Sequence, residues 1–263
     1  MTTTKGELTW NKCGLDLYTS MAGARLVHFT GVNKGDRVLD VGAGAGSSAI
    51  AAARRGGTVT ALDLSPELLE VAQQNAEIAG VKFETKQADA HQLPFEANSF
   101  DVVISAFGHM VMPDGEGVLR EMLRVLKPGG RLGVCTWPPT SPVGEFCRLL
   151  ERFHRVVGIP LLMNVTSWGK TDFIREQLGE AVTDIQFDIY TIRAPYMSPQ
   201  HHVRHVVQAG GRHAEEPKLT EEQQRLAKTV TFNMLDTVTP FFDETEHVIR
   251  FNCLLTRASK KTA

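Results

Sequence analysis

A short apolar segment that runs directly into a glycine-rich loop places strong limits on the fold. Residues 38–46 read VLDVGAGAG, in which three glycines occupy alternate positions after the apolar residues. A strand followed by such a loop leaves bare backbone at the carboxyl edge of a parallel sheet. In open α/β proteins, this edge binds ligands that contain adenosine. The segment therefore predicts an α/β fold with a ligand site around residues 40–46.

The residues that follow this loop alternate between strand and helix patterns. We predict strands at 37–41, 58–63, 81–87, 100–106 and 131–137. We predict helices between them at 45–54, 66–79 and 117–126. The helix at 66–79 has clear end signals, because Ser65 suits an N-cap, Pro66 the first helical position and Gly80 the C-terminal stop. This alternation is typical of a doubly wound, mostly parallel sheet with helices on both faces.

The two ends of the chain depart from this alternation. We expect residues 1–34 to form an N-terminal helical cap, residues 35–137 to form the ligand-binding core, and residues 138–263 to complete the same domain. Within the cap, helices are predicted at 15–22 and 24–29. The last part contains predicted helices at 145–157 and 198–238 and predicted strands at 184–193 and 247–256. We expect the two late strands to be antiparallel edge strands and the C-terminal helical insertion to lie beside the ligand edge.

Composition and charge exclude several classes of protein. The 263 residues are 42% hydrophobic, which is enough for a substantial core, and the formal net charge is −2. Without a basic excess, we expect no nucleic-acid partner. The four cysteines are scattered and include no C-x-x-C pair, so we expect neither a metal site nor a disulfide framework. This cysteine usage favours a cytoplasmic location. We expect no membrane span, since no run of about 18 apolar residues occurs, and the first ten residues do not resemble a signal peptide.

The loop itself distinguishes between cofactors. A dinucleotide-binding G-x-G-x-x-G pattern that begins at Gly42 requires a third glycine at position 47, where the chain has Ser47. Asp40 lies two residues before Gly42, and a carboxylate there disfavours a pyrophosphate. A cofactor that carries a positive charge fits this acid better, so a nicotinamide dehydrogenase is only a weak alternative.

Four stretches of the chain resemble the successive motifs of a known family. They are VLDVGAGAG (38–46), VTALDLSPELLEVA (59–72), QADAHQLPFEANSFDVVISAFG (87–108) and EMLRVLKPGGRLGVCTW (121–137). Their order and spacing resemble class I S-adenosylmethionine-dependent methyltransferases, especially the group that includes the ubiquinone and menaquinone C-methyltransferases. The resemblance covers about residues 35–137. It implies a Rossmann-like methyltransferase fold and S-adenosylmethionine as the cofactor.

The resemblance assigns residues to the adenosine end of this cofactor. Asp63 ends the second strand, where a carboxylate can accept both ribose hydroxyls. Leu64 offers an apolar flank for the adenine. Asp89 is expected to take the adenine amino group, with the backbone amide of Ala90 reaching the ring. For Asp89 the alternative is a turn in which its side chain bonds to the nearby backbone.

The methionine end is expected over the glycine loop. Gly42, Gly44 and Gly46 let the backbone approach the methionine moiety, although Gly42 could instead only satisfy the tight turn. Asp40 is expected to orient the loop and the cofactor's ammonium group. Ser105, near the end of the fourth strand, is expected to direct a carbonyl toward that ammonium.

Two polar residues are candidates for the catalytic side. His109 follows the fourth strand and is a candidate general base or a donor that orients the acceptor; the alternative is a helix-capping or partly buried histidine. Tyr18, in the N-terminal helices, is a candidate contact to the cofactor carboxylate or the acceptor; the alternative is a core tyrosine. His201 and His205, one turn apart, favour a solvated or substrate-facing helix over a zinc site.

The sequence therefore predicts an enzyme that transfers a methyl group to a small organic acceptor. Carbon or oxygen is the favoured acceptor atom. The alternatives are N- or S-methylation of a small molecule, or a protein that binds S-adenosylmethionine without chemistry. The partner is a small-molecule methyl acceptor, and the oligomeric state stays open.

Overall fold

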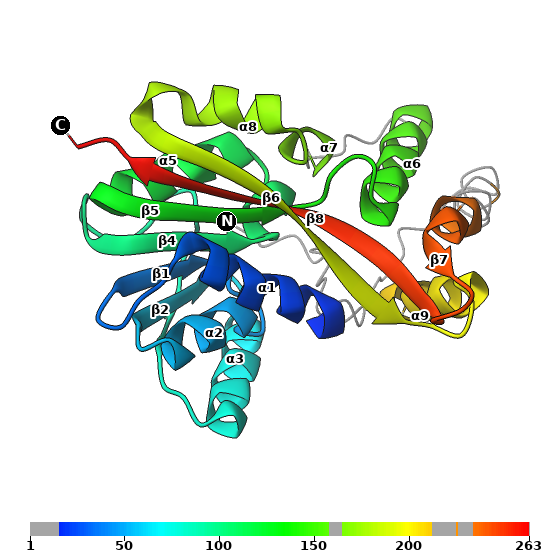
Figure 1. The fold of residues 1–263 in the computed structure, drawn as a ribbon, viewed down its shortest axis with the longest axis horizontal. Coiled ribbons are helices and arrows are strands. Elements are labelled where there is room, and N and C mark those ends of the chain that lie inside the picture. The colour runs from blue at the N-terminus through cyan, green and yellow to red at the C-terminus, as the bar shows by residue number, and fades with distance from the viewer. Residues whose placement is uncertain (1–15, 158–164, 212–224, 226–233, 263) are drawn as a thin grey trace.

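The computed structural model describes residues 16–157, 165–211, 225 and 234–262, which form one eight-stranded sheet covered by helices (Figure 1). The strands are β1 (Arg37–Val41), β2 (Thr58–Asp63), β3 (Glu84–Gln87), β4 (Phe100–Ala106), β5 (Leu126–Thr136), β6 (Val182–Pro195), β7 (Phe242–Asp243) and β8 (Val248–Lys260). Their order is β3-β2-β1-β4-β5-β8-β6, and β7 pairs with β8. Strands β1 to β5 are parallel, whereas β6, β7 and β8 are antiparallel additions. The predicted α/β fold with a mostly parallel sheet is confirmed.

The helices lie on both faces of this sheet. They are α1 (Asp16–Thr30), α2 (Ser47–Arg54), α3 (Pro66–Ala79), α4 (Gly108–Val111), α5 (Gly115–Val125), α6 (Pro142–Val157), α7 (Val165–Trp168), α8 (Thr171–Leu178) and α9 (Pro199–Gly211). Helices α1, α2 and α3 cover one face, and α5 and α8 cover the other (Figure 1). Because both faces are covered, the central strands are mostly apolar, and Val102, Val103 and Ile104 of β4 are all fully buried.

The elements with strong local signals have the predicted bounds. Strands β1, β2 and β4 and helix α3 begin and end where the sequence predicts. The Ser65 hydroxyl accepts a hydrogen bond from the backbone N–H of Leu68, and Gly80 ends α3 with a φ of 69°. The predicted strand at 81–87 is shorter, because the N–H of Val81 donates to the carbonyl of Ala76 and so belongs to the end of α3.

Helix α1 corrects the prediction of two separate helices near the N-terminus. The sequence suggests a break at Gly23, but α1 runs through it from Asp16 to Thr30. A Cβ placed on Gly23 would lie 2.7 Å from the Ser48 hydroxyl, so this glycine permits close packing of α1 against α2. Leu26 and Val27 are fully buried, and α1 contacts β4, β5 and β8. The described part of the predicted cap is therefore a layer on the sheet, while residues 1–15 lie outside the described residues.

Residues 127–130, which the prediction leaves between the helix at 117–126 and the strand at 131–137, are instead an irregularity within β5. Phe100 pairs with Leu126 and Val102 pairs with Arg131, so the KPGG segment is extra length on β5 between two paired positions. The strand therefore begins five residues before the predicted 131. Proline and two glycines at these positions weaken the strand signal without ending the strand.

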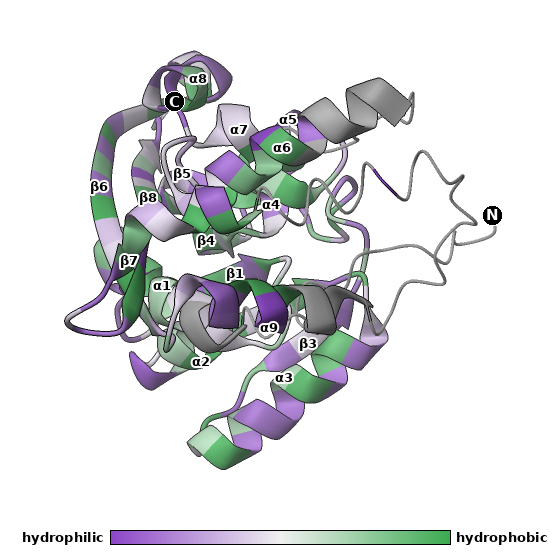
Figure 2. Cartoon of the chain, turned by 90° about the vertical axis from the view of Figure 1, so that its right-hand side faces the viewer, coloured by the Kyte–Doolittle hydropathy of each residue, from purple (hydrophilic) through white to green (hydrophobic). Residues whose placement is uncertain are grey.

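The two late strands form a ribbon that extends beyond the parallel strands. Thr136, the last residue of β5, pairs with Leu254, whereas the pairing of β6 with β8 continues to Pro195 and Val248. The ribbon thus projects past the carboxyl edge of the sheet, where α9 and β7 lie at its end (Figure 1). Figure 2 faces this edge and shows α6 and α9 in front of the strand ends. The described part of the C-terminal insertion therefore lies beside the predicted ligand edge.

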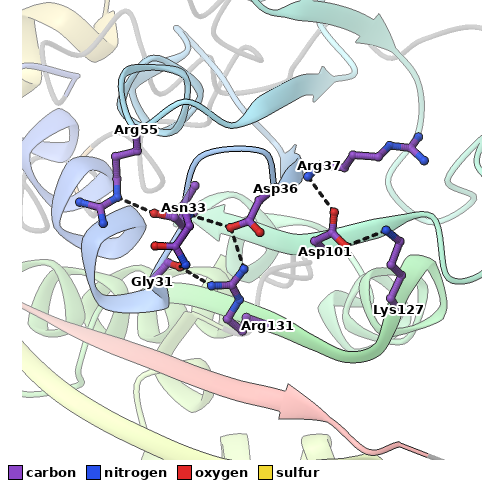
Figure 3. A network of polar contacts seen from close by, with 9 residues as sticks. Gly31, Asn33, Asp36, Arg37, Arg55, Asp101, Lys127 and Arg131 are labelled. Carbon is purple, nitrogen blue, oxygen red and sulfur yellow. Dashed lines mark hydrogen bonds and ion pairs between the residues drawn. The ribbon is translucent and has the colours of Figure 1, made fainter.

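A polar network fixes the opposite, amino edge of the sheet (Figure 3). The Arg131 guanidinium on β5 donates to the carboxylate of Asp36 at 2.7 Å and to the carbonyl of Gly31. Asp101 on β4 accepts from the backbone N–H of Arg37 at 2.9 Å and from the Lys127 ammonium at 2.6 Å. These bonds hold the turn between α1 and β1 against β4 and β5, far from the glycine loop.

Candidate functional site

The glycine loop bends over the end of β2. The backbone N–H groups of Gly42 and Ala43 both donate to the carbonyl of Leu62 at 2.9 Å, and the N–H of Gly44 donates to the Asp63 carboxylate at 2.8 Å. Gly42, Gly44 and Gly46 have φ values of 68°, 53° and 85°. These are conformations that other residues adopt only at a cost. The alternate glycines are therefore a requirement of the turn.

Two of these glycines also permit close packing within the protein. A Cβ on Gly42 would lie 2.9 Å from the Met112 methyl carbon and 3.1 Å from the Cα of Gly108. A Cβ on Gly46 would lie 2.9 Å from the Cβ of Ala72 on α3. Their predicted contact with a ligand stays a prediction, and their part in internal packing comes in addition to it.

Asp63 is held in place at the end of β2 by two backbone amides. Its Oδ2 accepts from Gly44 at 2.8 Å, and its Oδ1 accepts from the N–H of Ser65 at 3.0 Å. A carboxylate has about four acceptor sites, so each oxygen keeps capacity for a further donor. Leu64, the next residue, is 48% exposed although it is a large apolar side chain. An oriented acceptor and an exposed apolar side chain thus lie side by side.

Asp40 has the opposite environment, because it is buried beneath the same loop. The backbone N–H of Ala49 donates to its carboxyl group, and no described residue bonds its Oδ2. Burial, with a smaller contribution from the nearby charge of Asp63, raises the pKa of Asp40 to about 7 against the lowering effect of the Ala49 bond. A buried, unpartnered carboxylate oxygen favours a cation beside it. This environment fits a ligand with a positive group.

The predicted adenine-side acid, Asp89, bonds to its own turn. Its Oδ1 accepts from the backbone N–H of His91 at 2.9 Å and lies 2.7 Å from Nδ1 of that ring. This is the geometry of the alternative considered for Asp89. The same bonds, above all the one from the His91 backbone, lower the pKa of the carboxyl group, so Asp89 is ionised. Ala90 is buried directly after it, and the adenine contact of both residues stays a prediction.

Ser105 ties the end of β1 to the segment after β4. Its buried hydroxyl donates to the carbonyl of Val41 at 2.7 Å and accepts from the backbone N–H of His109 at 3.1 Å. The side chain is therefore occupied by internal bonds. The predicted role of the Ser105 carbonyl toward an ammonium stays a prediction.

His109 is fully buried in α4. Its ring packs edge-on against Trp168 of α7 with centroids 4.8 Å apart, and neither ring nitrogen has a hydrogen-bond partner among the described residues. Burial lowers its pKa to about 3, so the imidazole is neutral and a weak proton acceptor at neutral pH. The second candidate, Tyr18, belongs to the first part of α1, and the prediction for its side chain lies outside the described residues.

The structure adds residues that the sequence did not single out. Phe107 precedes α4 with a φ of 64° and stacks on Trp137 at 4.1 Å between centroids. A bulky residue in this conformation is strained, and such strain concentrates at functional sites. His91 lies between Asp89 and the carbonyl of Pro113. The nearest sequence signal was the DAH tripeptide, whose histidine gives no indication of a distant partner.

The histidines of α9 surround an aromatic side chain. Tyr196 lies within 4.7 to 6.0 Å, between ring centroids, of His201, His202 and His205. Within the described ranges, no group of three or more His, Cys, Asp or Glu side chains could hold a metal ion. Nor does any helix in this part of the chain combine the length and apolar composition needed to cross a membrane.

Comparison with known proteins gives this edge a chemical context. Residues 39–134, from the middle of β1 to near the end of β5, match the family described as Methyltransferase domain. This segment of the chain belongs to the methyltransferase domain family. The cofactor of the methyltransferase domain is S-adenosylmethionine.

Proteins similar to this chain include some with and some without a described activity. An uncharacterized protein of Mycobacterium tuberculosis is 37% identical over 164 residues, which are 62% of this chain and 60% of that protein. The demethylmenaquinone methyltransferase of Tropheryma whipplei is 39% identical over 156 residues, which are 59% of this chain and 62% of that enzyme. The matches thus span less than two thirds of these relatives.

Solved structures share the fold of this chain. The YcgJ protein of Bacillus subtilis has a TM-score of 0.62 at 20% identity, over 92% of this chain and 100% of that one. A Haemonchus contortus phosphoethanolamine N-methyltransferase, solved with phosphomonomethylethanolamine and S-adenosylhomocysteine, has a TM-score of 0.56 at 20% identity. That match covers 92% of this chain and 53% of the other. At this identity the likeness establishes the fold alone.

Proposed function

We propose that this protein transfers a methyl group from S-adenosylmethionine to a small organic acceptor. One observation carries the proposal: two acids of different character flank the glycine loop at the carboxyl edge. Asp63 is an oriented carboxylate with remaining acceptor capacity, and Asp40 is a buried carboxyl group with an oxygen that no described residue bonds. A ribose suits the first acid and an ammonium suits the second, and the cofactor carries both groups.

The adenosine end would lie along the ends of β2 and β3. Asp63 would accept the ribose hydroxyls through the lone pairs that Gly44 and Ser65 leave unused. The exposed Leu64 side chain would cover one side of the adenine. Asp89, exposed and ionised, would accept from the adenine amino group beside the backbone of Ala90.

The methionine end would lie over the loop itself. The backbone of Gly42, Gly44 and Gly46 has the open conformation that close approach needs. The ammonium would take the free lone pairs of Asp40, and its positive charge would favour the carboxylate form of that buried acid. The carbonyl of Ser105, from the neighbouring strand β4, would be a second acceptor.

The sulfonium of the cofactor supplies a methyl group that is already activated. The protein's own residues therefore need to align the acceptor and exclude water. We assign His109 the role of a neutral hydrogen-bond donor that orients the acceptor, because its low pKa makes it a poor base. Tyr18 remains the second candidate on this side of the site.

For the acceptor atom we propose carbon, as in a quinone-like ring, with a hydroxyl oxygen as the next choice. The relative named demethylmenaquinone methyltransferase supports a ring carbon. Val111 and Met112 are partly buried at the end of α4 and offer apolar surface beside the loop, whereas Met110 belongs to the core. An apolar rim suits an aromatic or isoprenoid-bearing acceptor.

Calorimetry and turnover test this function. The purified protein should bind S-adenosylhomocysteine, and it should transfer labelled methyl from S-adenosylmethionine to at least one compound in a panel of hydroquinones, phenols, amines and thiols. Asp63→Asn should weaken binding, because an amide can accept from only one of Gly44 and Ser65 and directs N–H toward the other. Asp101→Asn, on the opposite edge of the sheet, is the matched control and should leave binding unchanged.

Each result has a distinct meaning. Tight binding without transfer to any acceptor would favour a protein that binds the cofactor without chemistry. Binding of NADH in place of S-adenosylhomocysteine would contradict the proposal altogether. Transfer only to amines or thiols would keep the methyltransferase and correct the acceptor atom.

A further inference from the structure

The His91 ring lies between two hydrogen-bond acceptors. Its Nδ1 is 2.7 Å from Oδ1 of Asp89, and its Nε2 contacts the backbone carbonyl oxygen of Pro113. A neutral imidazole has a single N–H and can donate to only one of these oxygens. Both contacts are hydrogen bonds only when the ring is the imidazolium, because Asp89 is ionised and a carbonyl cannot donate.

The two partners of His91 belong to different walls of the site. Asp89 lies in the turn after β3, on the side proposed for adenine. Pro113 ends the segment 107–113, which connects β4 to α5 and contains His109 on the side proposed for the acceptor. His91 is thus a bridge between two segments whose functions are proposed to be different.

The charges around His91 favour its protonated form. They are Asp89 in its own turn and Asp114 at the N-cap of α5, and both act to raise its pKa. Partial burial opposes them, but the bond to Pro113 and the two acids outweigh it, so the pKa lies above the ordinary 6.5. The ring is 35% exposed, so it exchanges protons freely with solvent.

We propose that His91 is a positioning residue whose imidazolium joins the carboxylate of Asp89 to the backbone of segment 107–113, so that its protonation strengthens cofactor binding. The inference rests on the proposed function, since it gives Asp89 a role in holding adenine. With both bonds present, Asp89 and the acceptor-side segment have one fixed arrangement before the cofactor arrives. That preorganisation removes part of the ordering cost of binding.

The pH dependence has a definite sign. Below the ordinary pKa of histidine, the ring is protonated and both bonds are present. As the pH rises through the elevated pKa of His91, one N–H is lost, and the ring lone pair then faces an acceptor oxygen. The stabilisation from the bridge is therefore present at low pH and lost at high pH.

Calorimetric titration with S-adenosylhomocysteine between pH 6 and pH 9 tests the proposal. The bridge is exposed, so we expect its loss to weaken binding by about fivefold or less. His91→Gln can donate to only one acceptor and does not titrate, so the wild-type affinity should fall relative to this variant as the pH rises. Asp40 also titrates, but its effect is common to both proteins and cancels in the comparison. His28→Gln, on α1, is the matched control and should follow the wild-type curve.

Nuclear magnetic resonance of labelled histidine supplies a second measurement that needs no variant. By reciprocal linkage, a fivefold stronger binding to the protonated form requires that S-adenosylhomocysteine raise the pKa of His91 by about 0.7. Parallel affinity curves for wild type and His91→Gln, or a His91 pKa that the ligand leaves unchanged, would overturn the inference while the proposed function stands. Absence of S-adenosylhomocysteine binding to the wild type would refute the proposed function, and this inference with it.

Discussion

Replacement of Asp40 by asparagine tests the electrostatics of the site most directly. Burial moves the pKa of this acid from 3.8 to about 7. Between these two values the native state keeps a proton that the unfolded chain has lost. Native stability therefore falls as the pH rises through this window, and the full penalty, about 4 kcal/mol, is present above pH 7. Asparagine has nearly the same shape and does not titrate.

The expected difference between the two proteins follows from these values. At pH 5 the wild type carries about 1.6 kcal/mol of the penalty, and at pH 8 it carries all of it. The free energy of unfolding of Asp40→Asn, measured by urea denaturation, should therefore rise by about 3 kcal/mol relative to the wild type between pH 5 and pH 8. Subtraction of the two curves removes the titration of every other group.

The matched variant Asp101→Asn tests whether this pH dependence is specific to Asp40 or is shared by another aspartate on the sheet. The pKa of Asp101 is lowered, by the hydrogen bond and charge of Lys127 and the hydrogen bond from Arg37, which outweigh its partial burial. Its contribution is lost only when the pH falls into the acid range, so Asp101→Asn should differ from wild type by a constant amount between pH 5 and pH 8. A constant difference for Asp40→Asn as well would refute the reasoning, because it would mean that Asp40 is not held at a raised pKa.

Outcomes are also expected for four further variants. Asp63→Ala should weaken S-adenosylhomocysteine binding by about 10- to 100-fold in calorimetry, the scale for loss of a hydrogen bond to a charged group; an unchanged dissociation constant would remove Asp63 from the ribose site. Gly42→Ala should lower the free energy of unfolding by about 2 kcal/mol or more, through its φ of 68° and the crowding of Met112. Gly35→Ala, at a φ of 90° with nothing within 4 Å, should cost only about 1 kcal/mol. His109→Ala should lower turnover by about a hundredfold. The wild-type pH–rate profile should contain no step near pH 6.5 that is absent from the profile of the variant. Such a step would identify His109 as a base.

Much of the fold was accessible to sequence analysis because its signals are local. Helix α3 has an N-cap serine, a proline at its first position and a terminal glycine, and each acts within one turn of the chain. Consecutive branched apolar residues predict the buried strand β4. The order of the motifs was enough to indicate the methyltransferase core, since each motif ends a strand at the same edge.

The features that could not be predicted from the sequence depend on contacts between residues that are distant in the chain. Glycine often breaks a helix, but Gly23 instead leaves space for the Ser47 and Ser48 hydroxyls of α2 to pack against α1. His109 follows the fourth strand as expected, yet its burial, to which Trp168 far along the chain contributes, keeps the ring neutral. The bridge from His91 to Pro113 likewise joins residues whose proximity no local pattern expresses.

The position of β8 between β5 and β6 has a consequence for how the chain folds. Strand β6 precedes β8 in the sequence, but it has no place in the sheet until β8 has paired with β5. During synthesis, strand β6 must therefore stay unpaired until β8 is available, whereas the parallel strands β1 to β5 can already associate. Such late, long-range pairing is slow and leaves strand edges open to wrong partners. We expect a folding intermediate with an ordered cofactor edge and an unformed ribbon, which hydrogen exchange during refolding would detect as late protection of β6 and β8.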